Sequence, residues 1–186
     1  MERVAGSIPR RLKQSVSTGI KQAMKKLFLF LLPLAMFAAD LVKEVRHELV
    51  TLPYYGVFDN LAYRVDGSKV TLFGQVREPK LKSDAEKAVK SIEGVSAVDN
   101  QIEVMPLSTS DDQVRMAVYR AIYSKPNLQR YQMGAVPPIH IIVKNGDVTL
   151  EGAVATTGDK DTAGIAANGV GGVHKVVNNL RTDSSK

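Results

Sequence analysis

An internal repeat narrows the range of folds open to this chain more than any other property of its sequence. The segment Val70–Val76 (VTLFGQV) recurs 78 positions later as Val148–Val154 (VTLEGAV). The same offset aligns further positions without a gap: Gly74 with Gly152, Gly94 with Gly172, Val98 with Val176, and Asn100 with Asn178. A chain of 186 residues that carries such a duplication is expected to fold as two small units of like structure.

The first element predicted in each copy is an amphipathic helix. In the first copy the apolar residues at helical spacing are Leu41, Val45, Leu49 and Leu52. In the second copy a similar stripe of Val114, Val118 and Ala121 begins behind the N-cap candidates Asp111 and Asp112. The offset between these helices is 72, so the second copy carries about six extra residues within 131–138.

A hairpin, a second helix and a last strand are predicted to follow. The first hairpin strands are expected at 61–65 and 139–143, ended by the turn signals Asp66-Gly67 and Asn145-Gly146. The repeated segments alternate at period two and are expected to form the second strands. Helices are expected near 83–92 and 160–170, ending at glycine, and last strands at 98–104 and 176–181.

The predicted fold is therefore α+β, with two αββαβ modules. Each module is expected to hold a three-stranded mixed sheet with two helices on one face. The expected bounds are 40–106 and 111–183, joined by the linker MPLSTS at residues 105–110. Residues 1–39 are treated as a separate leader.

Two motifs, repeated in order, resemble those of the BON domain family. They are V-x-L-x-G-x-V at 70–76 and 148–154, and G-V-x-x-V-x-N at 94–100 and 172–178. The resemblance implies the αββαβ fold, binding to phospholipid membranes or support of envelope integrity, and no catalysis and no cofactor. A leader followed by two such domains is similar to osmotically inducible periplasmic proteins, which implies a role in osmotic or envelope stress.

The leader is predicted to direct export. Lys25-Lys26 precede an apolar run that ends at Ala39, a pattern typical of a secretory signal, and the run is shorter than the about 20 residues of a spanning helix. Met24 is an alternative start. The expected location is the periplasm, with peripheral membrane association or an uncleaved N-terminal anchor. The alternative is an N-terminal helix of a cytosolic protein.

The distribution of charge argues against a nucleic-acid partner. The net charge is +6, but residues 1–39 hold seven basic residues against one acidic residue, so residues 40–186 are neutral with 18 of each. Phosphate-backbone binding requires a basic footprint on the folded part. A neutral body indicates another kind of partner.

The inventory of reactive residues indicates a protein that is not an enzyme. The chain has no cysteine, and its three histidines, His47, His140 and His174, do not stand at a metal-binding spacing. The glycine cluster at 169–172 is expected to end a helix, whereas a phosphate cradle requires a helix that begins there. Asp159 and Asp161 are interpreted as N-caps. No catalytic residue, metal site or cofactor is predicted.

The candidate site is the first helix of the second copy, where amphipathic and basic side chains lie together. The candidate lipid-binding residues are Arg115, Met116, Tyr119, Arg120 and Tyr123. The resemblance implies a lipid-contacting role for this helix, and such side chains suit an anionic headgroup region. Ordinary packing of Tyr119 and Tyr123 is the alternative. The inserted residues 131–138, with Met133, form a second candidate contact loop.

Two functions follow from these patterns. The first is binding to the surface of an anionic phospholipid membrane. The second is docking onto an envelope protein of a secretion or transport assembly. Glycines and asparagines of the shared motifs are assigned structural roles: Gly74, Gly94, Asn100, Gly152, Gly172 and Asn178.

Overall fold

The computed structural model describes residues 40–134 and 136–182. The sheets of both repeats lie within one compact unit, Val42–Lys186. The predicted leader at residues 1–39 lies outside the described residues.

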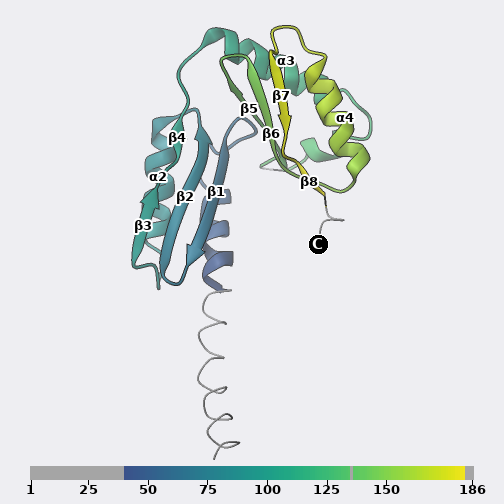
Figure 1. Cartoon of the computed structure of the whole chain (residues 1–186). Helices are drawn as coiled ribbons and strands as arrows, with labels where there is room; N and C mark the ends of the chain where they lie inside the picture. Colours follow the sequence, from purple (N-terminus) through teal and green to yellow (C-terminus); the bar gives the residue numbers. More distant parts are fainter. Residues whose placement is uncertain (1–39, 135, 183–186) are drawn as a thin grey trace, which may run out of the picture. The chain divides into compact units, whose positions relative to one another are not determined.

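Both repeats have the predicted αββαβ order (Figure 1). The first repeat comprises a helix over residues 40–50, β1 (Asn60–Asp66), β2 (Lys69–Val76), α2 (Pro79–Lys90), β3 (Ala97–Asn100) and β4 (Glu103–Val104). The second comprises α3 (Thr109–Tyr123), the short 3₁₀ helix η1 (Gln129–Gln132), β5 (Ile139–Lys144), β6 (Asp147–Val154), α4 (Thr157–Asn168), β7 (Lys175–Asn178) and β8 (Arg181–Thr182). The two helices of each repeat pack on one face of its mixed sheet, so the predicted fold class is confirmed.

The sheets differ from the prediction in one respect, because the last strand of each is broken in two. In the first repeat, β1 pairs with β2 antiparallel, and both β3 and β4 pair with β2 in parallel. The second repeat has the same arrangement, with β7 and β8 on β6. Each predicted third strand is therefore two short segments along one neighbour.

The motif asparagines explain this interruption. Asn100 Oδ1 accepts a hydrogen bond from the N–H of Ile102 at 3.2 Å, and Asn178 Oδ1 accepts one from Leu180 at 3.3 Å. Each amide nitrogen also donates to a carbonyl in the preceding helix, at Lys82 or at Lys160. Since the side chain replaces ladder contacts and ties the strand to the helix, each asparagine has a structural role.

The motif glycines of the second strands allow a close approach of the neighbouring strand. Gly74 and Gly152 have φ values of +116° and +115°. A Cβ atom would lie 2.1 Å from the carbonyl oxygen of Asn60 at Gly74, and 2.0 Å from that of Pro138 at Gly152. No other residue type fits both the backbone conformation and the space. Gly94 and Gly172 also have positive φ, in the turns that follow the helices.

Each repeat has its own apolar core between helices and sheet. In the second repeat, alternate residues of β5 and β6 are fully buried against α3 and α4: Ile139, Ile141, Val143, Val148, Leu150 and Val154. The first repeat buries Val70, Leu72 and Val76 of β2 against Val45 and Leu49 and against the apolar face of α2. The period-two and helical patterns in the sequence predict both cores.

A segment of the first repeat also contacts strand β5. The backbone N–H of Ile141 donates to the carbonyl of Val57 at 2.7 Å. Val57 and Phe58 pack against the core of the second repeat, and the Tyr55 ring stacks on the His140 ring at a centroid distance of 5.4 Å. We call residues 55–58 the clasp, because they attach to the outer edge of β5.

Candidate functional site

Helix α3, the predicted lipid-contacting element, begins three residues earlier than the first N-cap candidate, Asp111, suggests. Its N-cap is Ser108, whose hydroxyl accepts from the N–H of Asp111 at 3.2 Å. Asp111 is buried instead, and its carboxylate accepts from the N–H groups of Asn145 and Gly146 at 3.0 and 2.9 Å. The N-cap interpretation of Asp111 and Asp112 is therefore wrong, and Asp111 fixes α3 to the β5–β6 turn.

Arg115 does not lie on the surface of α3. Its side chain is 3% exposed, and its guanidinium donates to the carbonyl of Val143 and to the carboxylate of Asp112, each at 2.6 Å. A buried guanidinium with these partners has no access to a lipid headgroup. The predicted lipid contact is wrong for this residue. The sequence shows that a basic residue lies on the helix, but it does not show whether that residue has partners within the fold.

The two tyrosines of α3 pack within the second repeat. Tyr123 is 5% exposed, and burial raises the pKa of its hydroxyl well above the usual value. The ring of half-buried Tyr119 lies 4.7 Å from the Tyr123 ring and 6.0 Å from the Phe58 ring between centroids. The packing alternative therefore applies to Tyr123, which is unavailable to a membrane, while Tyr119 retains an exposed edge.

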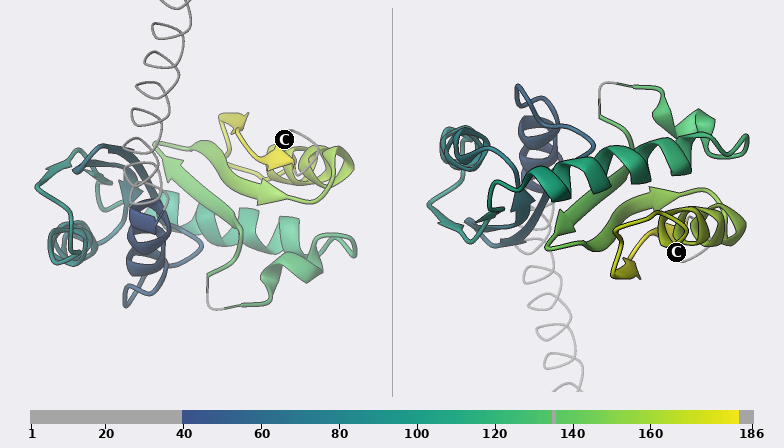
Figure 2. Two further views of the ribbon diagram at one scale, coloured as in Figure 1. Left: turned by 90° about the horizontal axis from the view of Figure 1, so that it is seen from below. Right: turned by 90° about the horizontal axis from the view of Figure 1, so that it is seen from above.

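Tyr119 also holds the inserted segment beside α3. The amide nitrogen of Gln132, in η1, donates to the Tyr119 hydroxyl at 2.7 Å. The next residue, Met133, is 81% exposed. The helix α3 and the segment after it are seen together in the right-hand view of Figure 2. The insertion therefore presents an apolar side chain next to the helix that the sequence singled out.

The insertion is anchored by a buried carboxylate on α4. Asp159 accepts hydrogen bonds from Asn127, Thr156, Arg130 and Tyr131, at 2.5 to 2.9 Å. Burial opposes ionisation of Asp159, but these hydrogen bonds outweigh it and lower its pKa to about 2. The N-cap of α4 is Thr156, so the interpretation of Asp159 and Asp161 as N-caps is wrong.

Two exposed side chains of the predicted lipid-binding set remain, Met116 and Arg120. Met116 is 41% exposed, Arg120 is exposed, and the Arg120 guanidinium has no hydrogen-bond or ion-pair partner among the described residues. Together with Met133 and the exposed edge of Tyr119, they form what we call the α3 surface. The surface therefore offers two apolar methionine side chains and one guanidinium without a partner, so it can make both apolar and electrostatic contacts.

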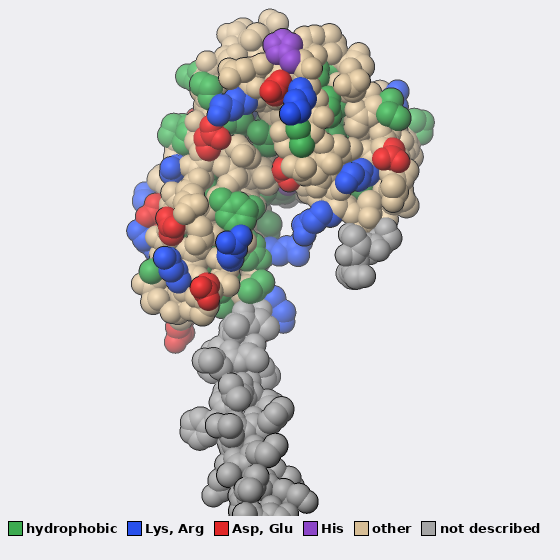
Figure 3. All heavy atoms as spheres, in the orientation of Figure 1, with side chains coloured by type: hydrophobic (Ala, Val, Ile, Leu, Met, Phe, Trp, Pro, Cys, Tyr) green, Lys and Arg blue, Asp and Glu red, His purple; other side chains and the backbone are tan. Residues whose placement is uncertain are grey.

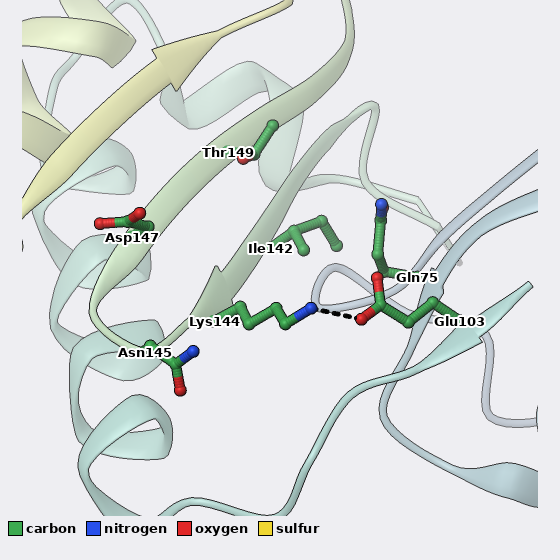
Figure 4. A pocket seen from close by; sticks show the side chains of 7 residues that line it. All are labelled: Gln75, Glu103, Ile142, Lys144, Asn145, Asp147 and Thr149. Carbon is green, nitrogen blue, oxygen red and sulfur yellow. Dashed lines mark hydrogen bonds and ion pairs between the residues drawn. The ribbon is translucent and has the colours of Figure 1, made fainter.

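A hollow with polar lining lies beside β5 and has a volume of about 350 Å³ (Figure 4). Its two facing charges, Lys144 and Glu103, form an ion pair of 2.5 Å. The remaining lining residues are Gln75, Ile142, Asn145, Asp147 and Thr149. The two facing charges of this hollow are taken up by their own ion pair.

His140 is the only strongly buried histidine of the described residues. Its contacts hold the clasp against β5. Its Nδ1 lies 3.3 Å from the carbonyl oxygen of Gly56, and its Nε2 lies 3.4 Å from the Tyr55 hydroxyl. Burial lowers the pKa of His140, and the Gly56 carbonyl partly opposes this. No local sequence pattern predicts this contact, because it joins residues from different repeats.

Acidic and basic side chains are interspersed over the face drawn in Figure 3. Among the described residues, acidic and histidine side chains nowhere gather into a group suited to a metal ion, and each helix is too short or too polar to cross a bilayer.

The family model described as BON domain matches residues 38–106 and 110–184. Similar solved structures include the C-terminal domain of CdsD, a structural protein of the type III secretion system of Chlamydia trachomatis. It is 13% identical, with 77% of this chain and 97% of that chain covered at a TM-score of 0.28. A second CdsD structure is 14% identical, with 76% and 91% covered at a TM-score of 0.28. These scores are too low to support an inference. No curated protein matches this chain.

Proposed function

Since this chain belongs to the BON domain family, as two copies of the domain, we propose that it is a non-enzymatic protein of the bacterial cell envelope that binds anionic phospholipid membranes. The α3 surface is the contacting element. One observation carries this proposal: the unpaired Arg120 guanidinium lies on the same helix as exposed Met116, beside the segment that presents Met133. The predicted export of the protein agrees with an envelope location.

The chemistry of the α3 surface fits the interfacial region of a bilayer. Thioether side chains can enter the boundary between headgroups and acyl chains, while a guanidinium on the same helix pairs with lipid phosphate. A single cation near an anionic surface contributes about 1 kcal/mol, and each buried apolar side chain adds about 1 to 2 kcal/mol. The binding is therefore peripheral and reversible.

Flotation with vesicles tests the proposal on the full chain. Wild-type protein is expected to bind vesicles that contain phosphatidylglycerol and to bind vesicles of phosphatidylcholine alone much more weakly. The double substitution Met116→Ser and Met133→Ser is expected to reduce binding at least about thirtyfold, corresponding to about 1 kcal/mol of lost apolar burial for each side chain. Its matched control is Ile165→Ser, which removes a 75% exposed apolar side chain from α4 instead.

A second pair of variants tests the electrostatic contribution to vesicle binding. Arg120→Gln is expected to weaken binding to the anionic vesicles about fivefold, corresponding to the loss of about 1 kcal/mol, and less so at high salt. Arg64→Gln makes the same change of charge at an exposed position of β1 and serves as the control. Equal binding by Arg120→Gln and Arg64→Gln, together with unaffected binding by the methionine variant, would rule out the α3 surface as the contact.

A further inference from the structure

The two sheets differ at their edge strands, although these strands occupy equivalent positions in the two repeats. Strand β5 is the edge of the second sheet, and the clasp occupies it through the hydrogen bond from the Ile141 N–H to the Val57 carbonyl. The position equivalent to Ile141, at the offset of 78, is Tyr63 in β1. β1 is likewise the edge of its own sheet and pairs only with β2.

The outward direction of the β1 backbone follows from one contact. The N–H of Leu61 donates to the Tyr55 hydroxyl at 3.4 Å, so at Leu61 the backbone polar groups point away from β2. Because this direction alternates along a strand, the N–H and C=O groups of Tyr63 and Val65 point the same way. Among the described residues, no segment beyond β2 is hydrogen-bonded to the backbone of Tyr63 or Val65.

A groove of about 1040 Å³ runs along this free edge. One wall comes from the helix over residues 40–50, where Val42, Arg46 and Val50 stand one turn apart and share a face. Phe73 lines it from β2. Val42, Val50 and Phe73 are 41%, 42% and 38% exposed, so the edge lies among partly open apolar side chains.

The groove has an excess of positive charge. Glu103 is neutralised by its ion pair with Lys144, whereas Glu151 accepts a hydrogen bond from the uncharged amide of Asn179 and keeps its charge. The basic side chains of Arg46 and Arg181 line the same groove and form no ion pair with a described residue. A ligand that carries carboxylates at intervals therefore complements this edge.

We propose that the free edge of β1 accepts an extended segment of another polypeptide, with alternating apolar and acidic residues, as an added strand. Backbone hydrogen bonds to Tyr63 and Val65 supply the register, as the clasp does at β5. Because side chains of a strand alternate between faces, the apolar side chains of the segment contact Phe73 on the open face of the sheet, and its carboxylates face the helix over residues 40–50, where one pairs with Arg46. This surface combines the β1 edge and the helix over residues 40–50 with Arg181 of β8, and it shares no residue with the α3 surface.

The test uses the full chain with two synthetic peptides of about eight residues, the length of an ordinary strand. One peptide alternates valine with glutamate and the other alternates valine with lysine. The glutamate peptide is expected to slow amide hydrogen exchange at Tyr63 and Val65, as followed by NMR, and to bind about tenfold more tightly than the lysine peptide.

The charge-reversal Arg46→Glu is an exposed substitution that leaves the core intact, and it is expected to shift the preference toward the lysine peptide. A second readout uses a glutamate peptide with proline at its central positions, which lacks the N–H groups of a strand and is expected to lose the protection. Lys43→Glu, on another face of the same helix, is the matched control.

Other results overturn the proposal. Protection that rises with protein concentration and without peptide indicates a second copy at this edge, and protection by phosphatidylglycerol vesicles alone indicates a lipid. Equal binding of both peptides to wild type and to Arg46→Glu, with Tyr63 and Val65 exchanging freely, leaves the edge without the proposed role.

Discussion

The two repeats place opposite chemistry at the same point of their second helices. At the offset of 78, Leu81 of α2 corresponds to Asp159 of α4. Leu81 is 2% exposed and belongs to an apolar core, whereas Asp159 is equally buried and collects four hydrogen bonds from side chains. α2 begins with Pro79 and without a side-chain cap, whereas α4 begins behind the cap of Thr156.

This difference explains why the second repeat presents the α3 surface while the first repeat forms the clasp. The extra residues of the second repeat are held by Asp159, and they carry Met133 to the α3 surface. The first repeat has no such insertion, and its corresponding segment is the clasp, which attaches to β5. The shared motifs therefore maintain the sheet, while the connection between the first helix and the first strand diverges.

The largest expected effect tests whether the two sheets are equivalent. Gly74→Ala and Gly152→Ala each place a Cβ within 2.1 Å of a carbonyl oxygen at a positive φ, so each is expected to destabilise its repeat by more than about 3 kcal/mol. Urea unfolding followed by circular dichroism measures this. Gly171→Ala, where a Cβ meets open space, is the control and is expected to change little. A mild effect at only one of the two strand glycines would show that the repeats tolerate this contact unequally.

The next effect is confined to the second repeat. Asp159→Asn removes the charge that four donors share, and it is expected to lower the free energy of unfolding by about 2 to 3 kcal/mol. Asp161→Asn, at an exposed position of the same helix, is the matched control. Identical urea midpoints for these two variants would mean that the Asp159 network adds no stability.

The pH dependence of the same site has a defined direction. The pKa of Asp159 is about 2 in the folded protein, below the ordinary value of about 4. The unfolded chain therefore binds a proton first as pH falls, so the contribution of Asp159 is complete above pH 4 and is lost toward pH 2. Wild type is expected to lose its advantage over Asp159→Asn across this interval, as measured by thermal unfolding at a series of pH values.

A smaller effect is expected in both repeats, and it is expected to be slightly larger in the first, where Asn100 also donates to Glu86 at 3.0 Å. Asn100→Ala and Asn178→Ala each remove the side chain that interrupts the last strand and binds the preceding helix, and each is expected to cost about 1 to 2 kcal/mol. Denaturant unfolding is the measurement, with Asn179→Ala, the neighbouring exposed asparagine, as the control. Unchanged stability of either of the first two variants would contradict their shared structural role.

The smallest effect concerns the clasp. His140 is held neutral by burial, which lowers its pKa, so the folded protein binds fewer protons than the unfolded chain in mildly acidic solution. Its contribution is complete above about pH 6.5 and declines as pH falls toward the lowered pKa, with a small decrease in Tm. His140→Gln is expected to remove this slope, whereas His174→Gln, at an exposed position, is expected to retain it.

The sequence was sufficient for the fold and only partly sufficient for the site. Duplication, period-two alternation and the Asn145-Gly146 turn signal predicted the order of elements, because these patterns depend on local backbone preference and on which face is buried. The break in each last strand was not predicted. It depends on a side chain of Asn100 or Asn178 that reaches a neighbouring helix, which no local pattern encodes.

The errors at α3 have the same physical origin. Arg115 and Arg120 are both basic residues on one helix, but Arg115 lies over the end of β5 and donates to Val143, whereas Arg120 faces outward. Helical spacing gives the angle between two side chains and not the position of the sheet beneath them. The Tyr55–His140 contact was beyond prediction for the same reason, since it joins residues 85 positions apart.

The clasp also means that the linker is a poor place to divide the protein. A fragment that starts at Leu107 would keep every element of the second repeat but would lose Val57 and Phe58. Its β5 edge would then present an unpaired Ile141 N–H to solvent, next to newly uncovered apolar side chains. Such an edge recruits strands from other molecules, so the separated half is expected to self-associate even though its own core is complete.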